Sequence, residues 1–487
     1  MDLKRRRNSV KVEIEKGIKG ADDQSRTFSA SIMDIPEHIF IDILLRLPLK
    51  GILVCKCTCK AWRRLILSPH FARIHYARSQ TSLLIRNLDS SCVPRTLYLI
   101  DPSEMDLKSC LGCDKELHLS LDVKLRIPLR NPLTALQMDA VKKKRRVRLK
   151  LTDQKFRIVN SYNGFLCLSE PSANEPVAVC NPVTGEYVEI PEGDKAYENF
   201  VDCGFGFCRN TNLYKVIRIF DTGIKRLIDC PIAQREMYSS RMAEIHTLGT
   251  QSWENVGYAP SYYGKLTSPT YLNGNLHWLQ EGWDSSTIIL SFDFNQECFK
   301  NFPPPMFEML NFEFALCDVR HMSMGVLRGD LFLCHASHNS INFWVMEKYG
   351  VQDSWTKLAK IRKSAWEHNY MYHPINYLRC GSLLIFHYPK NMLIHYDLKS
   401  KERSYFKVYG TRSKCEAVSL IPSFFSFKEA VQENIRVFNI RSLCARIKLQ
   451  GENKALYVRE EDKANIPSDS STYWSGDDYD SEDWPWY

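Results

Sequence analysis

Apolar and polar residues follow two different periods along this chain. Between residues 33 and 76, apolar positions recur every four residues, and two further apolar residues lie beside them: Ile35, Ile39, Ile43 and Leu47, with Phe40 and Leu44. This spacing predicts a helix with one apolar face. From Thr81 onward the pattern changes to short apolar runs separated by turn residues, which predicts β-strands.

Proline and glycine divide the helical stretch into three short helices. The Leu47-Pro48 pair ends the first, because a residue before proline is disfavoured in the α conformation. We expect Gly51 to open a second helix through Val54, and Trp62 to begin the apolar face of a third that ends at Pro69. So small a unit buries little surface by itself. Its apolar content therefore predicts a partner.

The order of residues in this stretch is specific. It runs Ile35-Pro36, then Ile43-Leu44-x-Arg46-Leu47-Pro48, then Lys50, Cys57-x-Cys59-Lys60-x-Trp62, Leu65-Ile66 and Pro69-x-Phe71. The pattern resembles the F-box, the adaptor-binding module of cullin-type ubiquitin ligases. Gly51 stands where that family often has serine, and Cys55 where it often has a larger apolar residue.

The F-box resemblance implies a set of adaptor-binding residues, some of which must also hold the helices together. They are Ile35, Pro36, Ile39, Ile43, Leu44, Leu47, Pro48, Trp62, Leu65 and Ile66. The implied partner is a Skp-type adaptor and, through it, a cullin.

A glycine turn followed by an apolar strand recurs in the rest of the chain. Copies begin at Asn163-Gly164, Asn273-Gly274, Arg328-Gly329 and Cys380-Gly381, at a spacing of very roughly 50 residues. Such a period is typical of propeller blades, which cover one another's faces in a ring. We expect five blades between residues 155 and 425. The strands at 82–100 supply a sixth or close the ring, and 101–153 is expected to be an irregular loop.

The ordered segments of these repeats resemble the F-box-associated domain that follows the F-box in a large plant family. The segments are NGFLCL, CNPVTGEYVEIP, GFGF, NLYKVIRI, LGTQSWENV, YLNGNLHWL and FDFNQECF. The resemblance implies a mainly β chain, with an N-terminal three-helix F-box followed by a kelch-like β-propeller. The expected domains are a disordered leader at 1–30, the F-box at 31–77, the propeller at 80–425 and an extension with an acidic tail at 426–487. We expect Trp253, Trp278 and Trp355 to pack between sheets.

Charge and cysteine usage indicate the cellular compartment of the chain. The chain of 487 residues has a net charge of +9, much of it in the basic run at 142–150. That run is a nuclear import signal, a nucleic-acid patch or, as we favour, a solvated loop. Charges interrupt every apolar run, so we expect no membrane span, and the N-terminus lacks a secretory apolar region. The 17 cysteines are scattered. These features predict a reduced protein of the nucleus and/or cytoplasm.

Candidate metal and cofactor motifs are weak. Cys55-x-Cys57-x-Cys59 lacks the two-residue spacing of paired zinc ligands. Cys110-x-x-Cys113 has that spacing, with His118 nearby, but no second pair follows. No phosphate-binding glycine loop or nucleophile elbow is present. We therefore expect no cofactor and no metal.

Two classes of function are compatible with these features. The first is a non-catalytic subunit of a Skp–cullin–F-box ubiquitin ligase, which binds a target protein through the propeller. The alternative is a propeller enzyme or ligand-binding protein, such as a copper oxidase, with an incidental helical cap. A third and weaker hypothesis is nucleic-acid binding through 142–150. The target itself is not readable from the sequence.

Overall fold

The computed structural model describes residues 35–87, 96–100, 118–122, 156–170, 174–193, 201–228, 236–260, 262–281, 288–306, 321–337, 339–363, 371–378, 381–388, 391–409, 415–430, 437–439 and 457–461. The expected leader, the basic run at 142–150, the Cys110-x-x-Cys113 pair and the acidic tail from Lys463 lie outside these ranges. The chain divides into two compact units, Met1–Arg46 and Leu47–Tyr487.

The described part of the first unit contains helix α1 (Glu37–Leu45). The carbonyl oxygen of Pro36 accepts the backbone N–H groups of Ile39 and Phe40, so the helix starts directly after this proline. It ends before Pro48, as predicted. The buried side chains of this helix are those of Phe40, Ile41 and Leu44. On the predicted apolar face, Ile39 and Ile43 are exposed, whereas Phe40 and Leu44 are buried.

Three helices open the second unit: α2 (Leu49–Thr58), α3 (Lys60–Ile66) and α4 (Pro69–Arg78). The third helix ends before Pro69, as predicted, but the expectation of three helices was wrong, because Pro69 begins a fourth. Proline is well tolerated in the first turn of a helix, and Pro69 begins α4, where the Oγ of Ser68 accepts the N–H of Phe71 at 3.2 Å. The prediction for Gly51 was also wrong, because α2 begins two residues earlier, with Pro48 at its N-cap.

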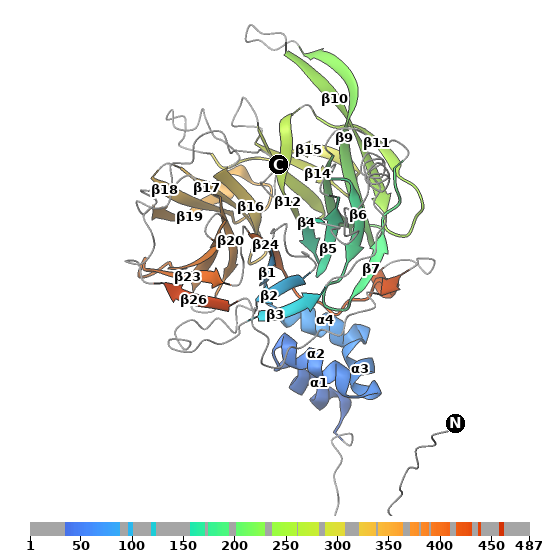
Figure 1. Cartoon of the computed structure of the whole chain (residues 1–487). Helices are drawn as coiled ribbons and strands as arrows, with labels where there is room; N and C mark the ends of the chain where they lie inside the picture. Colours follow the sequence, from blue (N-terminus) through green and yellow to red (C-terminus); the bar gives the residue numbers. More distant parts are fainter. Residues whose placement is uncertain are drawn as a thin grey trace, which may run out of the picture. The chain divides into compact units, whose positions relative to one another are not determined.

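The strands of the second unit form six antiparallel sheets (Figure 1). Sheet 1 contains β24 (Cys415–Leu420), β1 (Ser82–Asn87), β2 (Thr96–Ile100) and β3 (His118–Asp122). Sheet 2 contains β4 (Arg157–Tyr162), β5 (Phe165–Ser169), β6 (Pro176–Cys180), β7 (Glu186–Glu189) and β25 (Phe438–Asn439). Sheet 3 contains β8 (Asp202–Cys208), β9 (Leu213–Ile228), β10 (Glu236–Thr247) and β11 (Glu254–Tyr258).

The other three sheets follow in chain order. Sheet 4 contains β12 (Tyr263–Leu272), β13 (Asn275–Glu281), β14 (Ile289–Asp293) and β15 (Cys298–Asn301). Sheet 5 contains β16 (Met322–Leu327), β17 (Asp330–Ala336), β18 (Ser340–Met346) and β19 (Trp355–Arg362), with the short helix η4 (Gln352–Ser354) before β19. Sheet 6 contains β20 (Tyr372–Tyr377), β21 (Ser382–His387), β22 (Met392–Asp397), β23 (Arg403–Tyr409) and β26 (Tyr457–Glu461).

Sheets 2 to 6 are the five predicted blades, and the strands at 82–100 complete a sixth. Strand β1 pairs with β24 from near the other end of the chain, in a register that matches Ser82 with Leu420. Both alternatives for these strands are therefore confirmed, because the same pairing supplies a sheet and closes the ring. The expectation of an irregular loop from 101 to 153 was wrong in part, since β3 lies within it and pairs with β2.

Hydrogen bonds join each sheet to the next around the whole ring. Side chains make these bonds to backbone groups of the neighbouring sheet or, at one junction, of the residue before β1. The pairs are Ser161–Ser419 at 2.6 Å, Asn160–Phe205 at 2.8 Å, Asp202–Leu266 at 3.0 Å, Thr270–Met324 at 3.2 Å, Ser323–Tyr372 at 2.7 Å and Asn376–Thr81 at 3.0 Å. These bonds run from each of the six described sheets to the next, so the propeller is a closed ring.

Tryptophans pack where sheets meet, as predicted. Trp278 is buried and its indole N–H donates to the carbonyl of Cys203 in the preceding sheet at 3.3 Å. Trp253 and Trp355 donate to the carbonyls of Pro191 and Pro303, at 2.9 Å and 3.0 Å. A buried indole needs such an acceptor, so these bonds accompany the apolar packing.

The glycine turns also form as predicted, and two of them provide a test of ring closure. Gly164 and Gly329 both have positive φ, at 78° and 93°. A Cβ at Gly164 would overlap the side chain of Ser423 and lie 2.9 Å from the carbonyl oxygen of Ile421, whereas a Cβ at Gly329 would meet nothing within 4 Å. Only Gly164 is therefore constrained by packing as well as by its backbone conformation.

We expect Gly164→Ala to lower the free energy of unfolding by clearly more than Gly329→Ala. In both variants, holding alanine in the left-handed conformation costs about 1–2 kcal/mol of stability. Gly164→Ala adds about 1–3 kcal/mol of overpacking against the segment that closes the ring. Urea denaturation of the two variants measures the difference, and equal losses would show that the contact at Ser423 is not tight.

Candidate functional site

The structure separates the ten predicted adaptor-binding residues by exposure. Ile39, Ile43 and Leu47 are exposed, with 45%, 44% and 36% of their surface accessible. Pro36 and Pro48 are exposed as well, while Ile35, Trp62 and Leu65 are half-buried. Leu44 and Ile66 are buried, with 1% and 0% of their surface accessible, so in the free chain they are core residues. Contact with an adaptor remains a prediction for the accessible residues.

Exposed large apolar side chains are concentrated in one short part of the sequence. Among the described residues, seven such side chains are exposed, and Ile39, Ile43, Leu47 and Val54 all fall between residues 39 and 54. Single exposed apolar residues are common on protein surfaces. Their concentration in one segment is typical of a surface that a partner covers.

Of the three cysteines at 55, 57 and 59, Cys59 has a structural role. The Sγ of Cys59 accepts the N–H of Trp62 at 3.4 Å and caps α3. Cys55 is half-buried, and this burial raises the pKa of its thiol. Within the described ranges, no three His, Cys, Asp or Glu side chains are grouped so that they could hold a metal ion.

Helix α4 packs against a segment at 421–427 that follows the closing strand β24. We call this segment the closing strap. Phe424 of the strap lies against Phe71 and His75 of α4, with ring centroids 5.7 Å and 4.9 Å apart. Phe425 lies 5.1 Å from Tyr76. Since Phe71 and Phe424 are both buried, this aromatic group joins α4 to the propeller.

The propeller in turn holds the closing strap through two side chains of the β6–β7 hairpin. The Nδ2 of Asn181 donates to the carbonyls of Ser423 and Phe425, at 3.1 Å and 2.9 Å. The carboxylate of Glu186 accepts the N–H of Phe427 at 3.0 Å, at the start of the short helix α6 (Phe427–Ala430). Thus one strap connects sheet 1, sheet 2 and α4.

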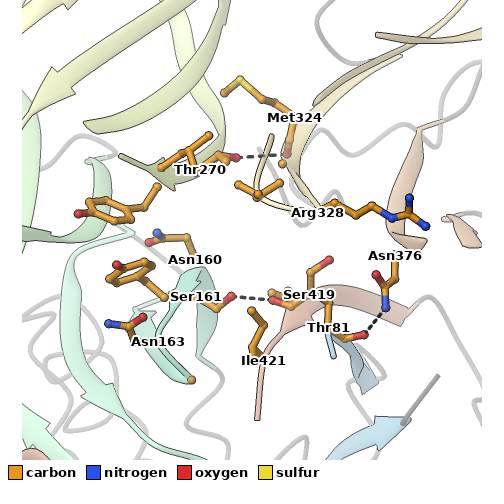
Figure 2. A pocket seen from close by; sticks show the side chains of 18 of the residues that line it. Thr81, Asn160, Ser161, Asn163, Thr270, Met324, Arg328, Asn376, Ser419 and Ile421 are labelled. Carbon is orange, nitrogen blue, oxygen red and sulfur yellow. Dashed lines mark hydrogen bonds between the residues drawn. The ribbon is translucent and has the colours of Figure 1, made fainter. Parts of the chain in front are cut away.

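A cavity of about 650 Å³ lies at the centre of the ring (Figure 2). Its walls come from the inner strands of five sheets, from the end of α4 and from the turns that follow the inner strands. Figure 2 shows that three of the junction hydrogen bonds, Ser161–Ser419, Thr270–Met324 and Asn376–Thr81, lie in its wall. The lining is rich in asparagine, serine and tyrosine, and it includes Arg209 and Arg328.

Burial keeps the titratable lining groups neutral. It lowers the pKa of His373 to about 4 and raises the pKa of the Tyr377 phenol, although Arg328 opposes the second shift. Burial also raises the pKa of Tyr162, against the opposing effect of Arg209. The phenols therefore act as neutral hydrogen-bonding groups, and the charge of the cavity comes from its arginines.

Sequence reasoning did not identify this cavity. Arg328 stands in a glycine turn that was recognised as a repeat, and Arg209 stands in the corresponding turn after β8. The repeat was therefore a usable signal, because equivalent turns of successive blades meet at the same end of the ring.

Comparison with known proteins agrees with this architecture. Residues 118–435 match the model of the F-box associated beta propeller domain, and residues 32–74 match the F-box domain. The chain belongs to the F-box associated β-propeller family. Within the described residues of this family member, no helix has the length and apolar content needed to cross a bilayer.

Several curated relatives of this family come from Arabidopsis thaliana. F-box protein At3g07870 is 28% identical over 66% of this chain and 71% of its own length. F-box/kelch-repeat protein At3g23880 is 26% identical over 67% and 79%, and F-box protein CPR1 is 24% identical over 80% and 88%. A solved nidogen/laminin complex is similar with a TM-score of 0.34 and 10% identity, over 71% of this chain and all of that one. That score is too low to support an argument.

The combination of an F-box with an F-box associated propeller supports a substrate-receptor role in general terms. F-box proteins are typically non-catalytic adaptors for their substrates. The closing strap matters for this role because it fixes helix α4 relative to the propeller that follows the F-box.

We expect Phe424→Ala to loosen α4 specifically. Removing a buried phenylalanine costs about 3–5 kcal/mol, and α4 loses its main aromatic contact with the propeller. Amide hydrogen exchange should therefore accelerate in α4 more than in β13.

Phe299→Ala is the matched control. Phe299 is half-buried and packs on Phe292 within sheet 4, with centroids 5.1 Å apart. Its loss should leave the amide exchange of α4 as in the parent. Unchanged protection of α4 in the Phe424→Ala variant would argue against the strap as the joint.

Proposed function

We propose that this chain is the target-binding subunit of a Skp–cullin–F-box ubiquitin ligase. The observation that carries the proposal is the exposure of Ile39 and Ile43, one helical turn apart on α1 in the segment that matches the F-box model. Two β-branched side chains at this spacing form a continuous apolar strip. A Skp-type adaptor is the partner proposed to cover it.

The energetics support a partner at this strip. Complete burial of an isoleucine contributes about 1.5–3 kcal/mol, and each of these side chains leaves nearly half of its surface available for burial. Interfaces depend on a few such anchors at their centre. Leu47 of the second unit is a further accessible apolar residue in the same F-box sequence.

The remaining parts of the chain have non-catalytic roles in this proposal. The propeller binds a target protein, and the adaptor links the F-box to a cullin. Bond formation belongs to the other components of the ligase, while this chain raises the effective concentration of a target lysine near them. We place this activity in the nucleus and/or cytoplasm. Nine of the described cysteines are free, which fits a reducing compartment.

We expect the double variant Ile39→Asp/Ile43→Asp to bind a Skp-type adaptor at least tenfold more weakly than the parent. Both side chains are exposed, so the charges should not disturb the fold of the free chain. Co-purification and surface-based binding measurements with the purified adaptor provide the readout.

Val351→Asp is the matched control, because Val351 has a similar exposure of 47% and lies in the loop between β18 and β19. It should bind the adaptor as the parent does. Retained adaptor binding by the α1 variant, with its melting temperature unchanged, would sink the proposed interface.

A further inference from the structure

The central cavity of the propeller has an unbalanced charge. Arg209 and Arg328 line it, and no aspartate or glutamate occurs among the described lining residues. A guanidinium keeps its proton under all physiological conditions. His373, the other basic lining residue, remains neutral because burial lowers its pKa to about 4. The cavity therefore carries two positive charges over a wide range of pH.

Neither arginine is neutralised by a carboxylate among the described residues. Arg209 donates from Nη2 to the Oδ1 of Asn273 at 3.2 Å. The guanidinium of Arg328 lies over the ring of Tyr377, 4.3 Å from its centroid. Both contacts orient a guanidinium while leaving most of its five donors available.

Two acidic side chains of sheet 4 are paired with lysines. Asp293 accepts from the Nζ of Lys300 at 2.7 Å, and Glu297 accepts from Lys215. Neither carboxylate lines the cavity. Their charges are therefore offset by Lys300 and Lys215 rather than by Arg209 or Arg328.

Both arginines lie at the same end of the cavity. Arg209 directly follows β8 and Arg328 directly follows β16, so each occupies the turn at the end of an inner strand. Asn163 and Asn273 occupy the equivalent turns after β4 and β12. Inner strands of a propeller run in the same direction, so these turns form one mouth. The mouth thus presents two cations with amide groups between them.

We propose that this cavity binds a small organic polyanion, a molecule with phosphate or carboxylate groups that contact Arg209 and Arg328. The volume of about 650 Å³ lies within the range of small-molecule sites. Arginine recognises phosphate and carboxylate groups through paired N–H donors. The inner strands of five sheets surround the cavity, which suits a compact molecule better than an extended peptide. The proposal is independent of the adaptor interaction.

Titration calorimetry of the purified full-length chain with pyrophosphate and with citrate tests the proposal. We expect at least one of these anions to bind the parent. In the double variant Arg209→Gln/Arg328→Gln, the dissociation constant of that anion should rise at least tenfold. Binding should also weaken as the salt concentration rises. Both side chains are exposed, so the variant should keep the melting temperature of the parent.

Arg362→Gln is the matched control, because Arg362 is an exposed arginine on β19 that does not line the cavity. It should change the dissociation constant by less than twofold. Arg328→Lys should retain part of the affinity, since it keeps the charge but loses the planar fork.

Three results would overturn the proposal. They are failure of both anions to bind, binding by the double variant that equals the parent, and equal weakening in Arg362→Gln. A synthetic acidic peptide with the sequence of residues 474–484 provides a fourth comparison. If it binds the parent more tightly than both small anions, and depends on the same arginines, the cavity mouth is a peptide site instead.

Discussion

The pairing of β24 with β1 is the constraint on which the rest of the structure depends. A four-stranded sheet has two faces to cover, and a ring covers both only when its last sheet meets its first. Here the final inner strand comes from residues 415–420 and its neighbour from residues 82–87. The entropy cost of joining distant segments grows only slowly with the length of chain between them. The burial gained at the last junction can therefore offset it.

The closing strap extends this constraint to the helices. Asn181 and Glu186 hold the strap on sheet 2, and Phe424 carries α4. The seven residues that directly follow the ring-closing strand therefore determine how α4 sits on the propeller.

The two surfaces with functional potential differ in their chemistry. The α1 strip is apolar and suits a partner that removes it from water. The cavity mouth is polar and cationic, and it suits a ligand whose charge offsets the cost of leaving water. In the two proposals, the apolar strip serves assembly and the cationic mouth serves recognition.

Local features of this protein were determined by the sequence itself. The end of α1 before Pro48, the positive φ of Gly164 and Gly274, and the order of F-box residues depend on side-chain sterics and short-range spacing. Each can be recognised without knowledge of the neighbours in space. The repeat of the glycine turns likewise predicted sheets 2, 4, 5 and 6.

Burial and convergence were decided only by the tertiary structure. Ile43 and Leu44 are adjacent apolar residues, yet one is 44% exposed and the other 1%, because burial depends on what packs against each face. Pro69 could equally end one helix or begin the next, and the packing of Phe71 on Phe424 accompanies the second outcome. Arg209 and Arg328 lie far apart in the sequence, so only the closed ring brings them to one cavity.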